Sequence, residues 1–342
     1  MNNKKTIVMT GGGTGGHLVI IEAIKEHLPY EDLIYIGSKN GQDKKWFEND
    51  GDFRNRYFLN TTGVVNKNVF SKFISLLKIA LATKKAIKIL KKNNVGVVFS
   101  VGGYSSAPAG FAAKVLKIPL IIHEQNAFIG RVNQTLLPYA KYFISSYIED
   151  SPIKAYPTKD EFFQKQRTRR DINCIIFLGG SQGALAINEL ALKIAPQLKE
   201  RDIKIIHQAG ENNIDFVTKE YQKLGIDAKV FGFTDKLSSH MNEADLAISR
   251  SGASTLWELG ANALPTIFIP YPHAAGNHQY HNAKFFLDKE MSWIMPQDKI
   301  DIDKIISILD EDLSYKSIKL MGIVEKYASV KIADLLKEEN KS

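Results

Sequence analysis

The sequence predicts an α/β protein built from two Rossmann-like domains that face each other across a cleft. Short apolar runs alternate with helical segments twice along the 342 residues, as buried parallel strands and their crossover helices do. A glycine-rich turn follows the first strand of each half, and ligands in such folds bind beyond the carboxyl ends of the strands. The length is sufficient for two domains of ordinary size.

Eleven apolar runs are predicted to be strands: Thr6–Thr10, Leu33–Gly37, Val95–Val101, Pro119–His123, Tyr142–Ser146, Asn173–Leu178, Lys204–Gln208, Lys229–Phe233, Leu246–Ser249, Thr266–Pro270 and Trp293–Met295. Helices are expected over Leu18–Leu28 and about Leu313–Glu338. We expect an N-terminal domain over 1–155, joined by the C-terminal helix at about 320–342, and a second domain over 156–320. A linker is expected within Glu149–Asp171, which contains Arg167, Arg169 and Arg170.

Charge is distributed unevenly along the chain. The stretch Phe53–His123 contains twelve Lys or Arg and no Asp or Glu, while the whole chain carries a formal net charge of +8. The N-terminal half is therefore expected to face an anionic membrane surface or nucleic acid, or to be a solvated basic face. No run reaches the roughly 18 apolar residues that span a bilayer. The single cysteine, Cys174, excludes an internal disulfide.

The first glycine turn, Gly11–Gly16, matches the dinucleotide fingerprint Gly-x-Gly-x-x-Gly. A strand precedes it and a helix follows, which is the arrangement of an anion site. The fingerprint also requires an acidic residue about 20 positions on, to bind a ribose hydroxyl. The second strand ends Ile36-Gly37-Ser38-Lys39, without a carboxylate. This absence disfavours a nicotinamide or flavin cofactor.

Further polar motifs follow other strands. Gly102-Gly103 could form a second anion turn or a tight packing contact, and His123-Glu124-Gln125-Asn126 ends the fourth predicted strand. In the second half, Ser251 or Ser254 is expected to cap a helix whose N-terminus favours phosphate. Glu258 on that helix could accept ribose hydroxyls or serve as a first-turn charge. The three histidines of His273–Asn282 lack carboxylate partners, so we expect sugar contacts and no metal there.

Six motifs together resemble the MurG-type N-acetylglucosaminyltransferases of peptidoglycan synthesis, over nearly the whole chain. They are Gly12-Gly13-Thr14-Gly15-Gly16-His17, Gly102-Gly103-Tyr104, His123-Glu124-Gln125-Asn126, Gly179-Gly180-Ser181-Gln182-Gly183-Ala184, Arg250-Ser251-Gly252-Ala253 with Glu258, and Gln279-Tyr280 with Asn282-Ala283. Leu18–Ile21 and Ala155–Lys159 depart from the family pattern, as do Ser254 and Trp257.

The resemblance implies a glycosyltransferase-B fold. It implies an inverting transfer of N-acetylglucosamine from UDP-N-acetylglucosamine to the muramyl C4 hydroxyl of the undecaprenyl-linked lipid I, giving lipid II, without a cofactor or metal. The implied donor contacts are Thr14, Gly15, Gly16, Asn126, Ser181, Thr234, Ala253, Ser254, Thr255, Glu258 and Gln279, and the implied acceptor contacts are Gly12, Gly13, Gly102, Gly103, Tyr104 and Ser105. Lys159 stands in the place of a family arginine and lacks its bidentate fork, so a donor contact by Lys159 is left open, as is one by Arg250.

An inverting transfer needs a base for the acceptor hydroxyl and hydrogen-bond donors for the departing diphosphate. His17 is the leading candidate for the base, since the ordinary pKa of histidine suits this work at neutral pH. Glu124 is the alternative.

The apolar residues Phe70, Phe73, Ile74, Leu77 and Leu81 recur at helical spacing beside Lys78 and other lysines. Core packing would explain such a stripe, but a lipid-linked acceptor favours docking to an anionic membrane. The chain is then expected to be peripheral on the cytoplasmic face of the inner membrane, with other cell-wall synthesis proteins as further candidate partners and no nucleic acid.

Three other functions remain as alternatives. They are a UDP-sugar transferase with a soluble or glycolipid acceptor, a basic nucleic-acid-binding module, and a dinucleotide reductase.

Overall fold

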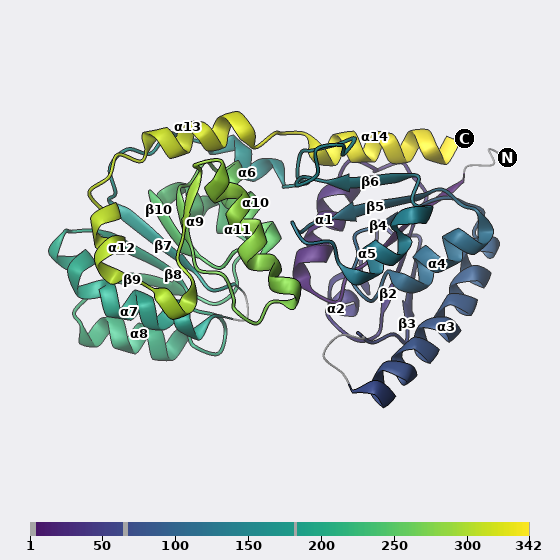
Figure 1. Cartoon of the computed structure of the whole chain (residues 1–342), viewed down its shortest axis with the longest axis horizontal. Helices are drawn as coiled ribbons and strands as arrows, with labels where there is room; N and C mark the ends of the chain where they lie inside the picture. Colours follow the sequence, from purple (N-terminus) through teal and green to yellow (C-terminus); the bar gives the residue numbers. More distant parts are fainter. Residues whose placement is uncertain (1–4, 64–67, 181–182, 342) are drawn as a thin grey trace. The chain divides into compact units, whose positions relative to one another are not determined.

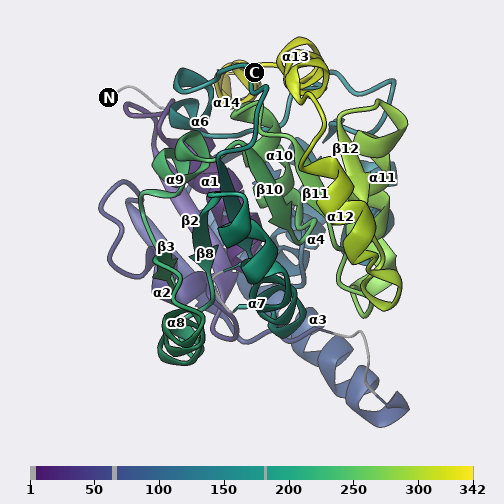
Figure 2. The same cartoon turned by 90° about the vertical axis from the view of Figure 1, so that its left-hand side faces the viewer.

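The computed structural model of the chain describes residues 5–63, 68–180 and 183–341. The chain forms two compact units, Met1–Pro157 with Tyr327–Ser342, and Thr158–Lys326. Each unit contains a six-stranded sheet flanked by helices (Figures 1 and 2). The chain passes from the first unit to the second after Pro157, two residues beyond the expected 155/156 boundary. It returns to the first unit at Tyr327, near the expected residue 320.

The sheet of the first unit has the strand order β3-β2-β1-β4-β5-β6, and every neighbouring pair is parallel. Its strands are β1 (Thr6–Thr10), β2 (Leu33–Ser38), β3 (Asn55–Leu59), β4 (Val95–Ser100), β5 (Leu120–Glu124) and β6 (Tyr142–Ser145). Five of them match predicted runs. Sequence reasoning missed β3, because this edge strand is half-buried and begins with Asn55 and Arg56, so it lacks a continuous apolar run.

The helices of the first unit are α1 (Gly15–Lys25), α2 (Asp43–Phe47), α3 (Val69–Lys92), α4 (Ala107–Leu116), α5 (Arg131–Leu136), the 3₁₀ turn η1 (Leu137–Tyr139) and α14 (Ala328–Lys341). A buried cluster joins one face of the sheet, including Val8, Ile34 and Val98, to α3 and α4. Helix α14 packs against α1 and β4.

The expected C-terminal helix is broken into two. Helix α13 (Ser314–Ile323) ends in the second unit and α14 begins at Ala328. Tyr327 between them has φ of +67°, which an uninterrupted right-handed helix does not accommodate. Within the first unit, Asn340 Nδ2 donates to the Lys5 carbonyl at 2.8 Å, and Glu339 pairs with Lys141 at 2.5 Å. The last helix therefore completes the N-terminal unit.

The sheet of the second unit has the order β12-β11-β10-β7-β8-β9 and is also parallel. Its strands are β7 (Cys174–Leu178), β8 (Lys204–Gln208), β9 (Ala228–Phe231), β10 (Leu246–Ser249), β11 (Thr266–Phe268) and β12 (Ser292–Ile294). Its remaining helical elements are α6 (Asp160–Gln164), α7 (Leu185–Glu200), α8 (Ile214–Lys223), α9 (Leu237–Glu243), α10 (Ala253–Ala261), η2 (Ala275–Asn277), α11 (His278–Asp288), η3 (Gln297–Lys299) and α12 (Ile302–Ile308).

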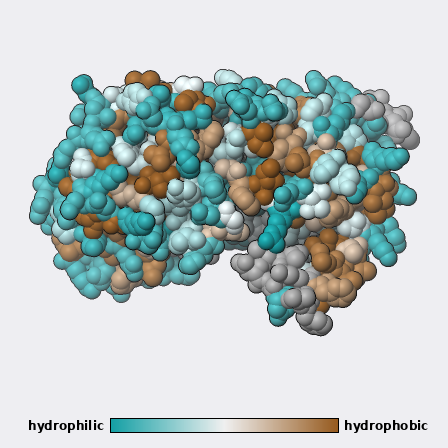
Figure 3. Space-filling view, viewed as in Figure 1, coloured by the Kyte–Doolittle hydropathy of each residue, from teal (hydrophilic) through white to brown (hydrophobic). Residues whose placement is uncertain are grey.

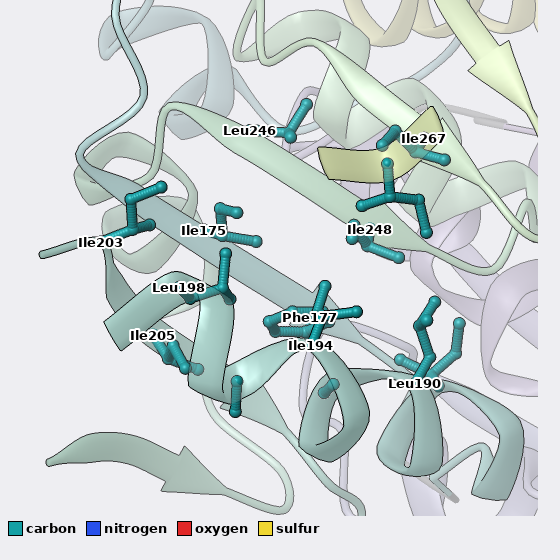
Figure 4. Close-up of a cluster of buried hydrophobic side chains, with 14 of the residues drawn as sticks. Ile175, Phe177, Leu190, Ile194, Leu198, Ile203, Ile205, Leu246, Ile248 and Ile267 are labelled. Carbon is teal, nitrogen blue, oxygen red and sulfur yellow. The ribbon is translucent and has the colours of Figure 1, made fainter. Parts of the chain in front are cut away.

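The core of the second unit follows from helical spacing. Figure 4 shows Leu190, Ile194 and Leu198 of α7, four residues apart, facing the isoleucines and Phe177 of the sheet. Residues at this spacing share one helix face. Cys174 is buried at the start of β7, and burial raises the pKa of its thiol to about 11, so the thiol is unreactive.

Arg169 occupies the most unusual buried position in the second unit, since its side chain is 1% exposed. Its Nε donates to the Ala244 carbonyl at 3.0 Å. Its terminal nitrogens donate to the carbonyls of Arg167, Met241 and Asn262 and to Asn262 Oδ1, at 2.6–3.1 Å. All five N–H donors of the guanidinium are thus used. The segment expected as a linker is in this part an integral piece of the second unit.

We predict that Arg169→Lys lowers the free energy of unfolding of the second unit by roughly 2–5 kcal/mol, because lysine has three donors and cannot satisfy this set of acceptors. Arg170→Lys is the matched control: the Arg170 side chain is 76% exposed and pairs only with a surface aspartate, Asp312, among the ion pairs described. It should change stability by less than about 0.5 kcal/mol. Urea denaturation of both variants makes the comparison, and equal stabilities would contradict it.

Candidate active site

The turn after β1 is built by glycines with positive φ. Gly11, Gly12 and Gly13 have φ of +123°, +149° and +86°, values that residues with a Cβ rarely adopt. The Gly12 amide donates to the Gly102 carbonyl at 3.2 Å, and the Gly13 amide donates to Asp43 Oδ2 at 2.6 Å. These two amides are therefore engaged within the unit, and an anion would instead meet the N-terminus of α1.

His17 lies in the first turn of α1, which begins three residues earlier than expected. The Thr14 hydroxyl and His17 Nδ1 share a hydrogen bond of 2.9 Å. Thr14 is the residue that precedes the helix, in an extended conformation with φ of −131°. The imidazole is thus held at the mouth of the glycine turn, next to Gly15 and Gly16.

The second glycine turn, after β4, lies against the first. A Cβ on Gly103 would lie 2.3 Å from the Gly12 carbonyl oxygen, so only glycine fits there. The Tyr104 ring covers Gly13, and its hydroxyl donates to the Asn40 carbonyl at 2.5 Å. Ser105 is fully buried. The structure thus brings together Gly12, Gly13, Gly102, Gly103 and Tyr104, the expected acceptor residues, with Ser105 beneath the surface.

Glu124 is a buried carboxylate that closes the loop after β5. Its Oε1 accepts from the Asn126 amide at 3.0 Å, and its Oε2 accepts from the Gly130 amide and Asn133 Nδ2, both at 2.9 Å. Burial nevertheless outweighs these hydrogen bonds and raises the pKa of Glu124. With both oxygens committed to the loop, Glu124 suits a structural role better than proton transfer.

The neighbouring His123 is fully buried, and its ring packs edge-on against Tyr156, 5.7 Å between centroids. Burial, with a smaller contribution from His17, lowers the pKa of His123 to about 3. This imidazole is therefore neutral at physiological pH.

Sequence reasoning missed Asp43. The residues at the end of the second predicted strand are Ser38 and Lys39, and neither carries a carboxylate. Asp43 lies at the start of α2, and the loop after β2 brings it back to the end of that strand. There its Oδ1 accepts a hydrogen bond from the Ser38 amide at 2.9 Å. Asp43 is fully buried, so it cannot serve a ribose hydroxyl as the dinucleotide fingerprint requires.

In the second unit, the glycine turn after β7 is described only in part. Gly180 and Gly183 have φ of +79° and +74°, and the Gly183 amide donates to the Gly180 carbonyl at 2.9 Å. Ser181, an expected donor contact, lies outside the described residues.

Helix α10 follows β10 and starts without a side-chain cap. The residue before it is Gly252, not Ser251 or Ser254 as expected. The Ser251 hydroxyl instead donates to the Gln279 carbonyl at 2.8 Å. The helix thus begins at Ala253 without a side-chain cap from the preceding residue, and a helix N-terminus carries partial positive charge.

Two other expected contacts, Thr234 and Arg250, lie on loops of the second unit, and a third, Gln279, lies in the first turn of α11. Gln279 Oε1 accepts from the Tyr271 amide at 2.9 Å, and the Thr234 hydroxyl accepts from the Lys236 amide at 3.0 Å. The Arg250 guanidinium donates to the carbonyls of Ile269 and Pro270 and to Gln297 Oε1, at 2.6–3.1 Å. Arg250 is thus occupied in bracing these loops.

Glu258 is a buried acid one turn into α10. Burial, reinforced by the negative charge of Glu161, raises its pKa to about 7, while Lys159 acts in the opposite direction. Lys159 precedes α6. The residue that departs from the family arginine therefore lies close enough to Glu258 to influence its charge.

Within the described ranges, no three His, Cys, Asp or Glu side chains are grouped so that they could hold a metal ion. The expectation of a metal-free reaction remains a prediction.

Comparison with known proteins places these features in a family. The N-terminal domain of glycosyltransferase family 28 matches residues 7–144, and the C-terminal domain of that family matches residues 174–332. A protein of Sulfurovum sp. (strain NBC37-1) is 61% identical over 98% of this chain and 100% of its own length. One from Campylobacter jejuni is 51% identical over 94% of both chains. Both are described as UDP-N-acetylglucosamine--N-acetylmuramyl-(pentapeptide) pyrophosphoryl-undecaprenol N-acetylglucosamine transferase.

Solved structures agree with this relation. The crystal structure of Acinetobacter baumannii MurG superposes with a TM-score of 0.80 at 26% identity, over 98% of this chain and 99% of that one. A UDP-glucose: anthocyanidin 3-O-glucosyltransferase in complex with UDP, at 12% identity and a TM-score of 0.66 with both chains fully covered, shares the fold alone. With its two parallel six-stranded sheets and glycine turns, the chain belongs to glycosyltransferase family 28, has the glycosyltransferase-B type of fold, and is a member of the MurG family within it.

Proposed function

We propose that this protein transfers N-acetylglucosamine from UDP-N-acetylglucosamine to the muramyl C4 hydroxyl of lipid I, forming lipid II with inversion at the anomeric carbon. The observation that carries the proposal is the 61% identity, over its full length, to a relative described as the transferase for this donor and acceptor. A transfer assay with UDP-N-acetylglucosamine and a lipid I analogue tests it. Turnover only with a soluble or glycolipid acceptor would favour the alternative UDP-sugar transferase.

We propose that the second unit binds the donor nucleotide. The uncapped start of α10 offers amide donors to the diphosphate, whose negative charge grows as the bond to the sugar breaks. Glu258, which lies on the same helix, accepts hydrogen bonds from the ribose hydroxyls. Thr234 follows β9, and Gln279 lies at the start of α11; ligands of this fold usually bind beyond the carboxyl ends of the strands.

We propose that the first unit binds the acceptor and supplies the base. The Thr14 hydroxyl holds the His17 imidazole through Nδ1. Its other nitrogen, Nε2, then takes the proton from the attacking hydroxyl, as general-base catalysis requires. We also propose that the reaction needs no metal ion, and that other cell-wall synthesis proteins are partners of this enzyme.

Membrane docking is proposed for α3, which has two apolar faces. One face is buried in the unit and includes Ile79, Ala82, Ala86 and Leu90. The other is exposed and consists of Phe73, Ile74, Leu76, Leu77 and Leu81, each 37–61% exposed; Figure 3 shows apolar side chains over this part of α3. The side chain of Phe70 lies outside the description.

Lysines surround this exposed face, including Lys78, Lys84, Lys85 and Lys88. A solvated helix would not present five large apolar side chains, whereas a helix at the surface of an anionic bilayer buries them and attracts its basic neighbours to the headgroups. No helix in the parts of the chain that are described is long and apolar enough to cross a membrane. We therefore propose a peripheral location on the inner membrane's cytoplasmic face, where the lipid-linked acceptor would be reached.

We predict that His17→Ala lowers kcat by about 10²- to 10⁴-fold, because a positioned general base contributes that much. UDP affinity should stay near that of the wild type, since the nucleotide is assigned to the other unit. Steady-state kinetics with both substrates, with calorimetric UDP binding, measure the two effects; His27→Ala controls for the loss of an imidazole near the same helix. Turnover within a few-fold of wild type would refute the assignment of His17.

We predict that donor binding depends on pH through Glu258. The pKa of Glu258 is about 7 in the free protein, and ribose hydroxyls donate best to the ionised carboxylate. Donor affinity should therefore be highest above pH 7 and fall by up to about tenfold per pH unit below it. Glu258→Gln should bind UDP more weakly and without this pH dependence.

Lys159→Met provides a second arm of the same experiment. It removes the positive charge that lowers the pKa of Glu258, so the fall in UDP affinity should begin at higher pH. Calorimetric titration of UDP between pH 5.5 and 8.5 measures both variants, and exposed Glu200→Gln is the control. Identical pH profiles for all four proteins would contradict the role of Glu258.

We predict that Phe73→Ser with Leu77→Ser reduces binding to vesicles that contain anionic lipid at least about tenfold, since each large apolar side chain contributes roughly 1–3 kcal/mol when buried. Flotation with anionic and with zwitterionic vesicles measures this. Leu224→Ser, an exposed leucine of the second unit, is the control. Unchanged binding, or binding that ignores anionic lipid, would count against docking through α3.

A further inference from the structure

Asp43 is a fully buried carboxylate with donors from two segments of the first unit. Its Oδ2 accepts from the Gly13 amide at 2.6 Å. Its Oδ1 accepts from the Ser38 amide at 2.9 Å and from the Tyr35 hydroxyl at 3.1 Å. The carboxylate therefore ties the glycine turn after β1 to the end of β2 through charge-assisted hydrogen bonds, the stronger class.

The space around this carboxylate is shaped by the same turn. A Cβ on Gly12 would lie 2.7 Å from Asp43 Oδ1, so the absence of a side chain at Gly12 makes room for the acid. Tyr35 also reaches the turn directly, since its single hydroxyl proton is shared between Asp43 Oδ1 and the Gly11 carbonyl, which lies nearer, at 2.8 Å. Tyr35 of β2 thus holds the carbonyl of Gly11, and Asp43 of α2 holds the amide of Gly13.

A simpler role for Asp43 would be to stabilise its own short helix, α2, as a first-turn acid. The contacts argue otherwise, because the carboxylate accepts hydrogen bonds from Gly13, Ser38 and Tyr35, which all precede that helix. A buried carboxylate is costly unless its oxygens are satisfied. Here the donors of Gly13, Ser38 and Tyr35 satisfy it. Gly13 is followed directly by Thr14, which holds His17.

We propose that Asp43 is a positioning residue for the transfer: by holding the Gly13 amide it fixes the Gly11–Thr14 turn, and with it the acceptor-facing backbone and the His17 imidazole. An anionic acceptor then meets the N-terminus of α1 and not the Gly12 and Gly13 amides, which are engaged. The effect on turnover rests on the proposed function, whereas the hold on the turn does not.

The experiment compares Asp43→Asn with Asp150→Asn, an exposed acid of the same unit. Asparagine has nearly the same size, but its NH₂ group must face either the Gly13 amide or the Ser38 and Tyr35 donors, so one anchor is lost. Hydrogen exchange measured by mass spectrometry on peptides spanning 9–18 should become at least tenfold faster in Asp43→Asn and stay unchanged in Asp150→Asn. Peptides of the second unit should exchange as in the wild type.

Steady-state kinetics supply the second readout. With lipid I analogue as acceptor, kcat for Asp43→Asn should fall at least tenfold, while KM for UDP-N-acetylglucosamine and the affinity for UDP remain within about twofold. Asp43→Glu, which restores two acceptor oxygens, should recover part of kcat. A merely structural role would instead lower stability and disturb both substrates together.

Tyr35→Phe keeps the inference testable if Asp43→Asn does not fold. This variant removes one donor to Asp43 and to Gly11 while keeping the ring that packs on Phe47 at 4.6 Å, and should produce the same changes at smaller size. Unchanged exchange and unchanged kcat in the folded variants would overturn the role of Asp43. A wild-type protein inactive with lipid I would refute the proposed function instead, and the exchange measurement would still decide whether Asp43 holds the turn.

Discussion

The close approach of two glycine turns is the constraint on which the first unit depends. The carbonyl of Gly12 fills the space that a side chain on Gly103 would need, and the Gly12 amide donates to the Gly102 carbonyl. Backbone at this distance is possible only without side chains. Because β1 and β4 are parallel neighbours, their carboxyl ends meet at one edge, and the turns that follow them must share it.

The buried charged residues are of two kinds: most are held by hydrogen bonds of the fold, and one, Glu258, is proposed to bind the donor. Asp43 and Glu124 each receive three or more hydrogen bonds from the loops that they hold, and Arg169 gives all five of its donors to neighbouring acceptors. Such groups are satisfied by the fold. Glu258 differs, because burial and Glu161 raise its pKa to about 7. Its ionisation therefore changes near neutral pH, and perturbed pKa values of this kind are common among acids at binding sites, which supports the proposed contact with the donor.

Helix α3 shows how one apolar pattern can serve two surfaces. Sequence periodicity identified Phe73, Ile74, Leu77 and Leu81 as a stripe and left core packing and membrane docking open. The structure buries a different set, centred on Ile79, Ala82 and Ala86, and leaves the identified stripe exposed. Small alanines in the buried set let α3 pack close to α4 and the sheet, while Phe73, Leu77 and Leu81 remain on the outer side. That division is what makes an interfacial role physically reasonable.

The sequence by itself determined the fold class, eleven of the twelve strands and the family, because buried parallel strands and glycine turns leave strong local patterns. The same local patterns singled out His17, Gly12, Gly103 and Glu258 as candidate site residues. Only the tertiary structure decided the break at Tyr327, the buried stripe of α3, the uncapped start of α10 and the commitment of Glu124 and Arg250 to their loops. Asp43 is the sharpest case. No acid directly follows β2 in the sequence, yet the next segment brings Asp43 back to the end of that strand. Contacts of this kind depend on the path of the folded chain and leave no local sequence pattern.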